Sequence, residues 1–195
     1  MIGNKGISPF RSSSVVAPVE MTNEHKYSRQ TLTGRRRRGR ARTNRRLNYL
    51  IHKRMKLYIG SDHGGLELKH YLMGKFKEGE FIDLGHFDYD KKDDYPEIAH
   101  QAAEAILEDA GTLGILICSS GLGMSMAANR HPGIRAAVCL STKMAKLSRQ
   151  HNNANILCLG GKFINKGRAL RILNKFVKTK FEGGRHQRRV EGIEI

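Results

Sequence analysis

The chain has 195 residues, 39% of them hydrophobic, and a formal net charge of +17. That length allows one domain with a full hydrophobic core and a tail. No apolar run approaches the roughly 20 residues that a membrane span needs, and the N-terminus lacks the apolar core of a signal peptide. We therefore expect a cytoplasmic protein with no membrane partner.

The positive charge is concentrated at the N-terminus. Residues 1–54 carry 14 Lys or Arg and two acids, a net charge of +12, whereas residues 55–195 have a net charge of only +5. The overall charge therefore does not make the rest of the chain a nucleic-acid binder. Because residues 1–54 lack periodicity and their like charges repel, we predict a disordered basic extension, within which 47–54 could form a short helix. The domain is predicted to cover 55–195.

The run RRRRGRARTNRR at 35–46 has several interpretations. It could be a nuclear signal, a nucleic-acid contact, or part of an organellar targeting peptide, which is typically rich in Arg and poor in acids. Alternatively, translation starts at Met55 and the extension is absent from the mature protein. We expect nucleic acid as a partner only through this run, if at all.

From residue 55 the hydrophobic pattern becomes regular, with short apolar runs typical of strands alternating with amphipathic runs typical of helices. Pro96 suits the first turn of a helix, and Thr142 and Asn165 are the expected caps of the last two helices. The predicted strands cover 56–61, 80–85, 113–118, 134–140 and 155–160, and the helices that follow them cover 66–76, 96–109, 122–130, 142–151 and 165–178.

Five strands that alternate with five helices predict an α/β fold. Because the strands are mostly continuous apolar runs, we expect a Rossmann-like, doubly wound, five-stranded parallel sheet with helices on both faces. We assume the strand order 2-1-3-4-5, which is common in this class. Ligands then bind at the carboxyl ends of the first and third strands, where Asp62-His63 and residues 118–123 would be neighbours.

The sequence ILICSSGLGMSMAAN at 115–129 indicates a strand, a tight loop and a helix. Backbone amides at such a helix start can hold a phosphate or a developing oxyanion, and glycines let the backbone come close. Cys118 lies at the edge of this loop, which favours a catalytic thiol, although a strand cysteine can equally be a buried core residue.

Cys139 and Cys158 also lie in apolar runs, so we expect free thiols in a reducing compartment. No Cys/His cluster has metal-ligand spacing. The sequence lacks a Walker-type motif, and Gly121-Leu122-Gly123 does not fit the dinucleotide fingerprint. We therefore expect neither a metal nor another cofactor.

Three further groups could take part in chemistry. Asp62 and His63 could point into the strand-end crevice, or Asp62 could cap a turn. His151 could act as a general acid or base, or be a structural residue stabilised by a helix C-terminus. Arg185 and Arg189 could hold a phosphate from one helical face, or form a solvated basic end. Together these groups suit proton transfer on a small phosphorylated molecule.

Five motifs in order resemble the type B ribose-5-phosphate isomerases, a family that includes galactose-6-phosphate isomerase subunits. The resemblance covers residues 55–195. It implies an aldose-ketose isomerase of the pentose phosphate pathway that interconverts D-ribose 5-phosphate and D-ribulose 5-phosphate without a metal. A homodimer or homotetramer with shared active sites is also implied. The motifs are GSDHGG at 60–65, DYP at 94–96, ILICSSGLGMSMAAN at 115–129, SRQHNNAN at 148–155 and FEGGRHQRRV at 181–190.

The resemblance also implies residue roles. Cys118 matches the base that moves a proton between C1 and C2 through an enediolate, and His151 matches the residue that opens the furanose ring. Ser120, where many members have Thr, would assist the proton relay. The other matching catalytic or substrate-binding residues are Asp62 and Asn152 at the sugar hydroxyls, Tyr95 near the pocket, Ser119, Gly121 and Gly123 in the loop, and His63, Arg185 and Arg189 at the phosphate.

Two positions depart from the family pattern. Lys162 stands where Arg is common, which keeps the charge but loses the bidentate fork, and Ser119 stands where Gly is common. Both match positions near the substrate, so another phosphosugar of the family, such as galactose 6-phosphate, allose 6-phosphate or a tetrose phosphate, is the alternative substrate. Galactose-6-phosphate isomerase subunits are disfavoured because this chain keeps His151 and the GGRHxxR motif.

Overall fold

The computed structural model describes residues 54–85 and 87–194. The predictions of a disordered extension and of a short helix over 47–54 therefore lie outside the described residues, except for Arg54. The boundary of the domain at residue 55 stays a prediction. No helix among the described residues is long and apolar enough to cross a membrane.

A five-stranded parallel sheet forms the centre of the molecule, which confirms the predicted fold class. Its order is β2-β1-β3-β5-β4, so the assumed order 2-1-3-4-5 is wrong for the last two strands. The difference follows from burial. β5 is buried throughout and lies inside the sheet, whereas β4 has only three half-buried residues and is the outermost strand. The strands are β1 Met55–Ser61, β2 Gly79–Asp83, β3 Leu113–Cys118, β4 Ala136–Val138 and β5 Ile156–Gly160.

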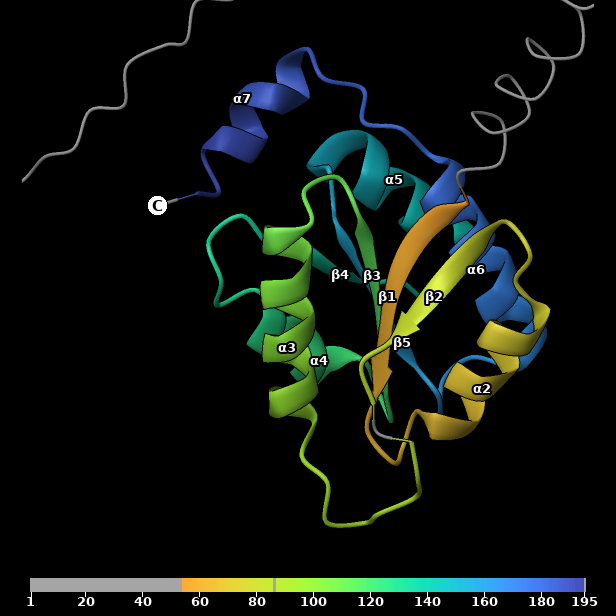
Figure 1. Cartoon of the computed structure of the whole chain (residues 1–195). Helices are drawn as coiled ribbons and strands as arrows, with labels where there is room; N and C mark the ends of the chain where they lie inside the picture. The colour runs from red at the N-terminus through yellow and green to blue at the C-terminus, as the bar shows by residue number, and fades with distance from the viewer. Residues whose placement is uncertain (1–53, 86, 195) are drawn as a thin grey trace, which may run out of the picture. The chain divides into compact units, whose positions relative to one another are not determined.

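Helices cover both faces of the sheet, as Figure 1 shows. On one face the apolar sides of α2, α5 and α6 pack on the sheet around Phe176, and on the other face α3 and α4 pack around Met124. A last helix, α7, contacts α5. The bounds are α2 Leu66–Lys75, α3 Tyr95–Glu108, α4 Leu122–Ala128, α5 Thr142–Asn152, α6 Lys166–Lys178 and α7 Arg185–Glu191.

The helices start within one residue of the predictions, α7 is a helix beyond the five predicted, and the cap of α5 differs from the expected one. The Asn165 side chain accepts a hydrogen bond from the Arg168 amide at 2.9 Å and caps α6 as expected. In α5 the cap is Ser141, whose hydroxyl accepts from the Met144 amide at 3.2 Å, and not Thr142. The reason is that the capping residue needs extended backbone, which Ser141 has, whereas Thr142 is already helical.

The two ends of the sheet carry different loops. All strands are parallel, so their carboxyl ends lie at one edge, which we call the carboxyl edge, and their starts lie at the opposite amino edge. α5 runs back from β4 to the start of β5, so its last residues lie at the amino edge. In Figure 1 the arrowheads of β1 and β2 point downward, and α7 lies at the top, next to α5.

Candidate active site

The end of β3 lies between the ends of two other strands at the carboxyl edge. Ser61 of β1 pairs with Ile117, and Cys118 pairs with Gly160 of β5. The segments that leave these strands therefore emerge side by side. This confirms that Asp62-His63 and the loop after Cys118 are neighbours, and it adds the turn at 160–162 on the other side of that loop.

These three loops approach one another through their main chains. A side chain at Gly65 would come within 2.3 Å of the Ile117 carbonyl oxygen, and one at Gly160 within 2.6 Å of the Ser120 carbonyl oxygen. The Gly161 amide donates a hydrogen bond to the Cys118 carbonyl oxygen at 2.8 Å. Main-chain contacts from both neighbours thus fix the position of the loop after β3.

The Cys118 sulfur receives a hydrogen bond within its own loop. The Gly121 amide donates to Sγ at 3.0 Å. Gly121 has φ +79°, in the left-handed region that favours glycine, and it caps the start of α4. Reactive cysteines commonly lie at helix starts, as this sulfur does. The Ser120 hydroxyl, two residues on, accepts from the Leu122 amide at 3.3 Å, which places it at the same helix start.

Gly64 makes room for the side chain of Ser119. A Cβ at position 64 would lie 2.3 Å from the Ser119 hydroxyl oxygen, closer than real Cβ contacts allow. On the other side of the loop, the Lys162 amide donates to the Ser119 carbonyl oxygen at 3.0 Å. Of the two residues that depart from the family pattern, Ser119 therefore belongs to the loop after β3 and Lys162 contacts it through its main chain. The missing side chain of Gly64 accommodates Ser119.

Asp62 forms the turn that the sequence left as one of two interpretations. Its carboxylate accepts a hydrogen bond from the Gly65 amide at 3.1 Å, just before α2. Burial raises the pKa of Asp62, against the opposing effect of the nearby His63. The turn and a role at the crevice are compatible, because one carboxylate can accept several hydrogen bonds.

His63 is held by a carboxylate that sequence reasoning missed. His63 Nδ1 lies 2.5 Å from Asp93 Oδ1, and the Asp93 side chain is buried. This hydrogen bond raises the pKa of His63 and so favours its positive form. The position of Asp93 directly before the DYP motif at 94–96 does not by itself indicate this pair, because the two residues are 30 positions apart in sequence.

Tyr95 lies against the start of α4. A Cβ at Gly123 would come within 2.6 Å of the Tyr95 ring, so the ring packs over the first turn of that helix. Tyr95 therefore borders the same loop as Cys118. The carboxyl-edge group, which the structure brings together, consists of Asp62, His63, Tyr95, Lys162 and residues 118–123.

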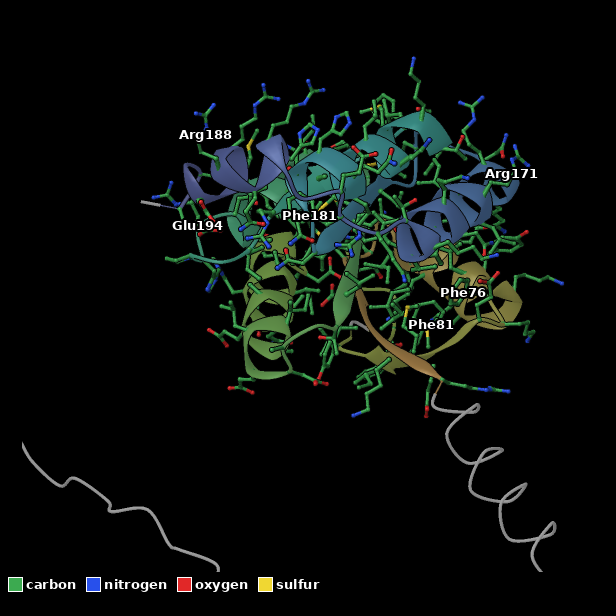
Figure 2. The ribbon with its side chains drawn as sticks, turned by 90° about the horizontal axis from the view of Figure 1, so that it is seen from above. Phe76, Phe81, Arg171, Phe181, Arg188 and Glu194 are labelled. Carbon is green, nitrogen blue, oxygen red and sulfur yellow. The ribbon has the colours of Figure 1, made fainter. Side chains whose placement is uncertain are left out.

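The other predicted residues lie at the amino edge. His151 and Asn152 end α5, and Arg185 and Arg189 are exposed on α7. Figure 2 is turned to look from the end that carries α7, and it shows Arg188 directed outward from this helix. We call His151, Asn152, Arg185 and Arg189 the amino-edge group. Within one chain the two groups are at opposite edges of the sheet.

Two unpredicted side chains surround His151. Its ring stacks on that of His186, with centroids 4.2 Å apart and an interplanar angle of 4°. Glu182 Oε2 lies 3.8 Å from Nε2 of each histidine. Desolvation lowers the pKa of His186, with a smaller effect of His151 in the same direction. No pattern of residues predicted this arrangement, because α5 and α7 meet only in the folded chain.

All three cysteines are free and buried, and Cys139 and Cys158 lie away from the loop after β3. Burial raises the pKa of Cys139 to about 11, against a smaller opposing effect of the Ser148 hydroxyl, whose oxygen lies 3.8 Å from the sulfur. Burial also raises the pKa of Cys158. Neither thiol therefore resembles Cys118, which has an amide donor on its sulfur.

Residues 57–193 match the family model described as Ribose/Galactose Isomerase. The chain is 44% identical over 140 residues to a probable ribose-5-phosphate isomerase B of Mycoplasma genitalium, covering 70% of this chain and 92% of that protein. It is 42% identical over 140 residues to ribose-5-phosphate isomerase B of Escherichia coli, covering 71% and 93% of the two chains.

Solved structures support the same family relationship as the sequence relatives. A ribose 5-phosphate isomerase from Thermotoga maritima superposes with a TM-score of 0.70 at 45% identity, covering 72% of this chain and 97% of that one. Ribose-5-phosphate isomerase B from Mycoplasma genitalium with bound ribulose-5-phosphate gives a TM-score of 0.69 at 43% identity, covering 73% and 95%. The chain therefore belongs to the ribose/galactose isomerase family of aldose-ketose isomerases.

Proposed function

We propose that this isomerase interconverts D-ribose 5-phosphate and D-ribulose 5-phosphate, with Cys118 as the general base. The substrate is supported by relatives at 41–44% identity that are named ribose-5-phosphate isomerase B, and by the relative with bound ribulose-5-phosphate. The base is supported by one observation above all, the Gly121 amide that donates to Cys118 Sγ at 3.0 Å in a loop that opens a helix.

The proton transfer uses one thiol in both directions. The Cys118 thiolate removes the proton from C2 of the open-chain aldose, and the released electron pair forms the C1–C2 double bond of an enediolate. The negative charge moves to the former carbonyl oxygen, which amides of residues 119–123 would stabilise. The thiol then returns its proton to C1. The proton of the O2 hydroxyl passes to O1 with help from Ser120, which leaves the carbonyl at C2.

Phosphate binding is assigned to cations from both edges. His63 carries its charge readily because Asp93 raises its pKa, so it suits a phosphate oxygen next to the Cys118 loop. Arg185 and Arg189 are exposed and one helical turn apart on α7, which suits a bidentate grip on the same phosphate. These arginines lie at the edge remote from Cys118, so they would have to come from another chain.

A homodimer, alone or paired into a tetramer, would complete the site. In a dimer with a two-fold axis, the carboxyl-edge group of one chain meets the amino-edge group of the other, and two equal sites result. The second chain would supply His151 for ring opening and Asn152 for the sugar hydroxyls. Exposed apolar side chains near the carboxyl edge, Leu122 and Met126 on α4 and Phe163 after β5, are available for such a contact.

Mixing two inactive variants tests the shared site. Cys118→Ala and His151→Ala are each expected to lose turnover. When the two are unfolded and refolded together, half of the dimers should be mixed, and each mixed dimer has one intact site, so about a quarter of the activity returns. Co-refolded Cys118→Ala with Cys118→Ser is the matched control and should stay inactive. Absence of recovery would place both residues in the same chain's site and refute the shared site.

A direct assay of ketose formation decides the substrate. We expect turnover with D-ribose 5-phosphate, and weaker turnover with galactose 6-phosphate, allose 6-phosphate and a tetrose phosphate. The comparison matters because Ser119 and Lys162 lie at the loop that would face the sugar. Efficient turnover of one of these other sugars, with none of ribose 5-phosphate, would refute the proposed substrate but not membership of the family.

A further inference from the structure

Two histidines and a carboxylate converge at the amino edge. Nε2 of His151 and Nε2 of His186 each lie 3.8 Å from Glu182 Oε2, and one ligand atom from each residue lies within 4.8 Å of the others. Among residues 54–85 and 87–194, it is the one group of three His, Cys, Asp or Glu side chains close enough to hold a metal ion. We propose that His151, Glu182 and His186 bind a divalent transition-metal cation such as Zn²⁺, and that a bound ion inhibits the isomerase.

The ligand types and spacing suit zinc. Imidazole nitrogens and carboxylate oxygens bind Zn²⁺ at about 2.0–2.2 Å in a tetrahedral arrangement, which puts neighbouring ligand atoms roughly 3.3 Å apart. The separations of 3.8 Å from the carboxylate therefore need only small side-chain movements. The two rings are stacked, so the larger movement is a rotation of the half-exposed His151 ring.

The surrounding structure already positions two of the three ligands. His186 is buried, with 6% of its surface exposed. Glu182 is tied to α5 by Gln150, whose amide side chain donates to Glu182 Oε1 at 2.5 Å and whose carbonyl oxygen accepts from the Glu182 amide at 3.1 Å. That leaves Oε2 for the histidines. The side chains of His151 and Glu182 remain partly exposed, so the fourth ligand of a bound ion would be water.

The charges beside the three ligands act in opposite directions. Metal binds the neutral imidazole, and burial lowers the pKa of His186, which favours that form. The positive charges of Arg185 and Arg189 oppose a bound cation, while the carboxylate of Glu182 favours one.

The inhibition rests on the proposed function, whereas the cation site does not. In the proposed mechanism His151 exchanges a proton with the furanose ring, and a cation on its Nε2 occupies the nitrogen that would do so. Binding and inhibition should therefore follow the same concentration dependence. The inhibition should also be reversed by a chelator, because no bond of the protein is changed.

Cobalt absorption tests the binding of the cation, and zinc inhibition tests its effect on turnover. The full-length protein is titrated with Co²⁺, whose visible spectrum reports tetrahedral nitrogen and oxygen ligands, and Zn²⁺ is used to displace it. Turnover of ribose 5-phosphate is measured over the same range of Zn²⁺. Glu182→Gln and His186→Asn should each weaken Co²⁺ binding and Zn²⁺ inhibition at least about tenfold. Glu182 is exposed, so its variant remains informative if the His186 variant fails to fold.

A second histidine pair supplies the matched control. His100 Nδ1 and His131 Nε2 lie 2.8 Å apart on the exposed surface of α3 and the segment after α4, without the carboxylate. His131→Ala should leave Co²⁺ binding and Zn²⁺ inhibition unchanged, and a loss of either would overturn the proposal. Unchanged affinity in folded Glu182→Gln, or a thiolate-to-Co²⁺ charge-transfer band that disappears in Cys118→Ala, would overturn it too.

The outcomes also separate the site from the proposed function. Co²⁺ binding that depends on Glu182, in a protein without turnover of ribose 5-phosphate, supports the cation site and refutes the proposed function. Binding that depends on Glu182 without inhibition of an active enzyme refutes the inhibitory role of the ion. Parallel loss of binding and inhibition in Glu182→Gln supports both statements.

Discussion

Replacing Gly64 by alanine tests whether the loop after Cys118 is held as tightly as its contacts indicate. The new Cβ would lie 2.3 Å from the Ser119 hydroxyl oxygen, 3.0 Å from the Ser119 amide nitrogen and 3.3 Å from Asp62 Oδ1. The main chain of Ser119 cannot easily retreat, because its carbonyl oxygen is bound to the Lys162 amide on the far side. The hydroxyl must therefore change rotamer, or the loop must shift.

Overpacking of this kind typically costs about 1–3 kcal/mol of unfolding free energy. We also expect a lower kcat/KM for Gly64→Ala, since Cys118 directly precedes the displaced residue. Ser119→Gly removes the hydroxyl and leaves the amide nitrogen, at 3.0 Å, as the nearest atom of residue 119. In that background the alanine should cost less, with a coupling energy of about 1–2 kcal/mol between the two changes.

Urea unfolding and ketose formation, measured on the wild type, both single variants and the double variant, give this coupling. Gly74→Ala is the matched control, because a Cβ at this position in α2 meets nothing within 4 Å. Removing a helical glycine there should raise the unfolding free energy by about 0.5–1 kcal/mol. The reasoning is refuted if Gly64→Ala is as stable as the wild type, or if its cost is the same with Gly at position 119.

Three further predictions follow from the proposed site. Cys118→Ala should abolish isomerisation while ribulose 5-phosphate still binds in calorimetry, since the thiol transfers a proton and the phosphate contacts supply most of the affinity. Arg189→Ala should mainly raise KM, because a phosphate contact is equally strong in the ground and transition states. Asp93→Asn should destabilise the fold more at about pH 6 than at about pH 9. The pKa of His63 is raised in the folded protein, so its pair with Asp93 stabilises the fold fully below the pKa of histidine in the unfolded chain. This stability is lost as the pH rises through the pKa of His63 in the folded protein.

Each of the three has a contradicting result. Residual turnover in Cys118→Ala would remove the thiol from the role of base. A fall in kcat at unchanged KM in Arg189→Ala would mean that the arginine acts only in the transition state. The control is Arg188→Ala, on the outward side of α7, which should behave like the wild type. Equal destabilisation of Asp93→Asn at both pH values in urea unfolding would show that the charge on His63 adds no stability through Asp93.

The sequence was sufficient for the fold class because each strand is a short, continuous apolar run. The run at 113–118 matches β3 without error. The positions of β4 and β5 could not be predicted in the same way, since both are apolar and only packing decides that the fully buried strand lies inside. At Ser141 and Thr142 two neighbouring hydroxyls are equally good caps in sequence, and the backbone angle chooses between them.

The candidate site was predictable to the extent that it follows strand ends. Asp62, His63 and Cys118 come directly after or at the end of adjacent strands, so the topology alone brings them together. The distance of His151 from Cys118 depends on the direction of α5, which a list of motifs does not contain. Asp93 was missed because it meets His63 across 30 residues of sequence, and Glu182 because the grouping of His151 with Glu182 and His186 forms only where α5 and α7 meet.

The different environments of the three thiols have a practical consequence for chemical labelling. The raised pKa values of Cys139 and Cys158 leave these groups as protonated thiols at neutral pH, whereas Cys118 is the most exposed of the three, at 5%, and lies at a helix start. An alkylating reagent should therefore add once per chain, and the amount incorporated would count active sites. The same selectivity makes Cys118 the thiol at which oxidants would first inactivate the enzyme.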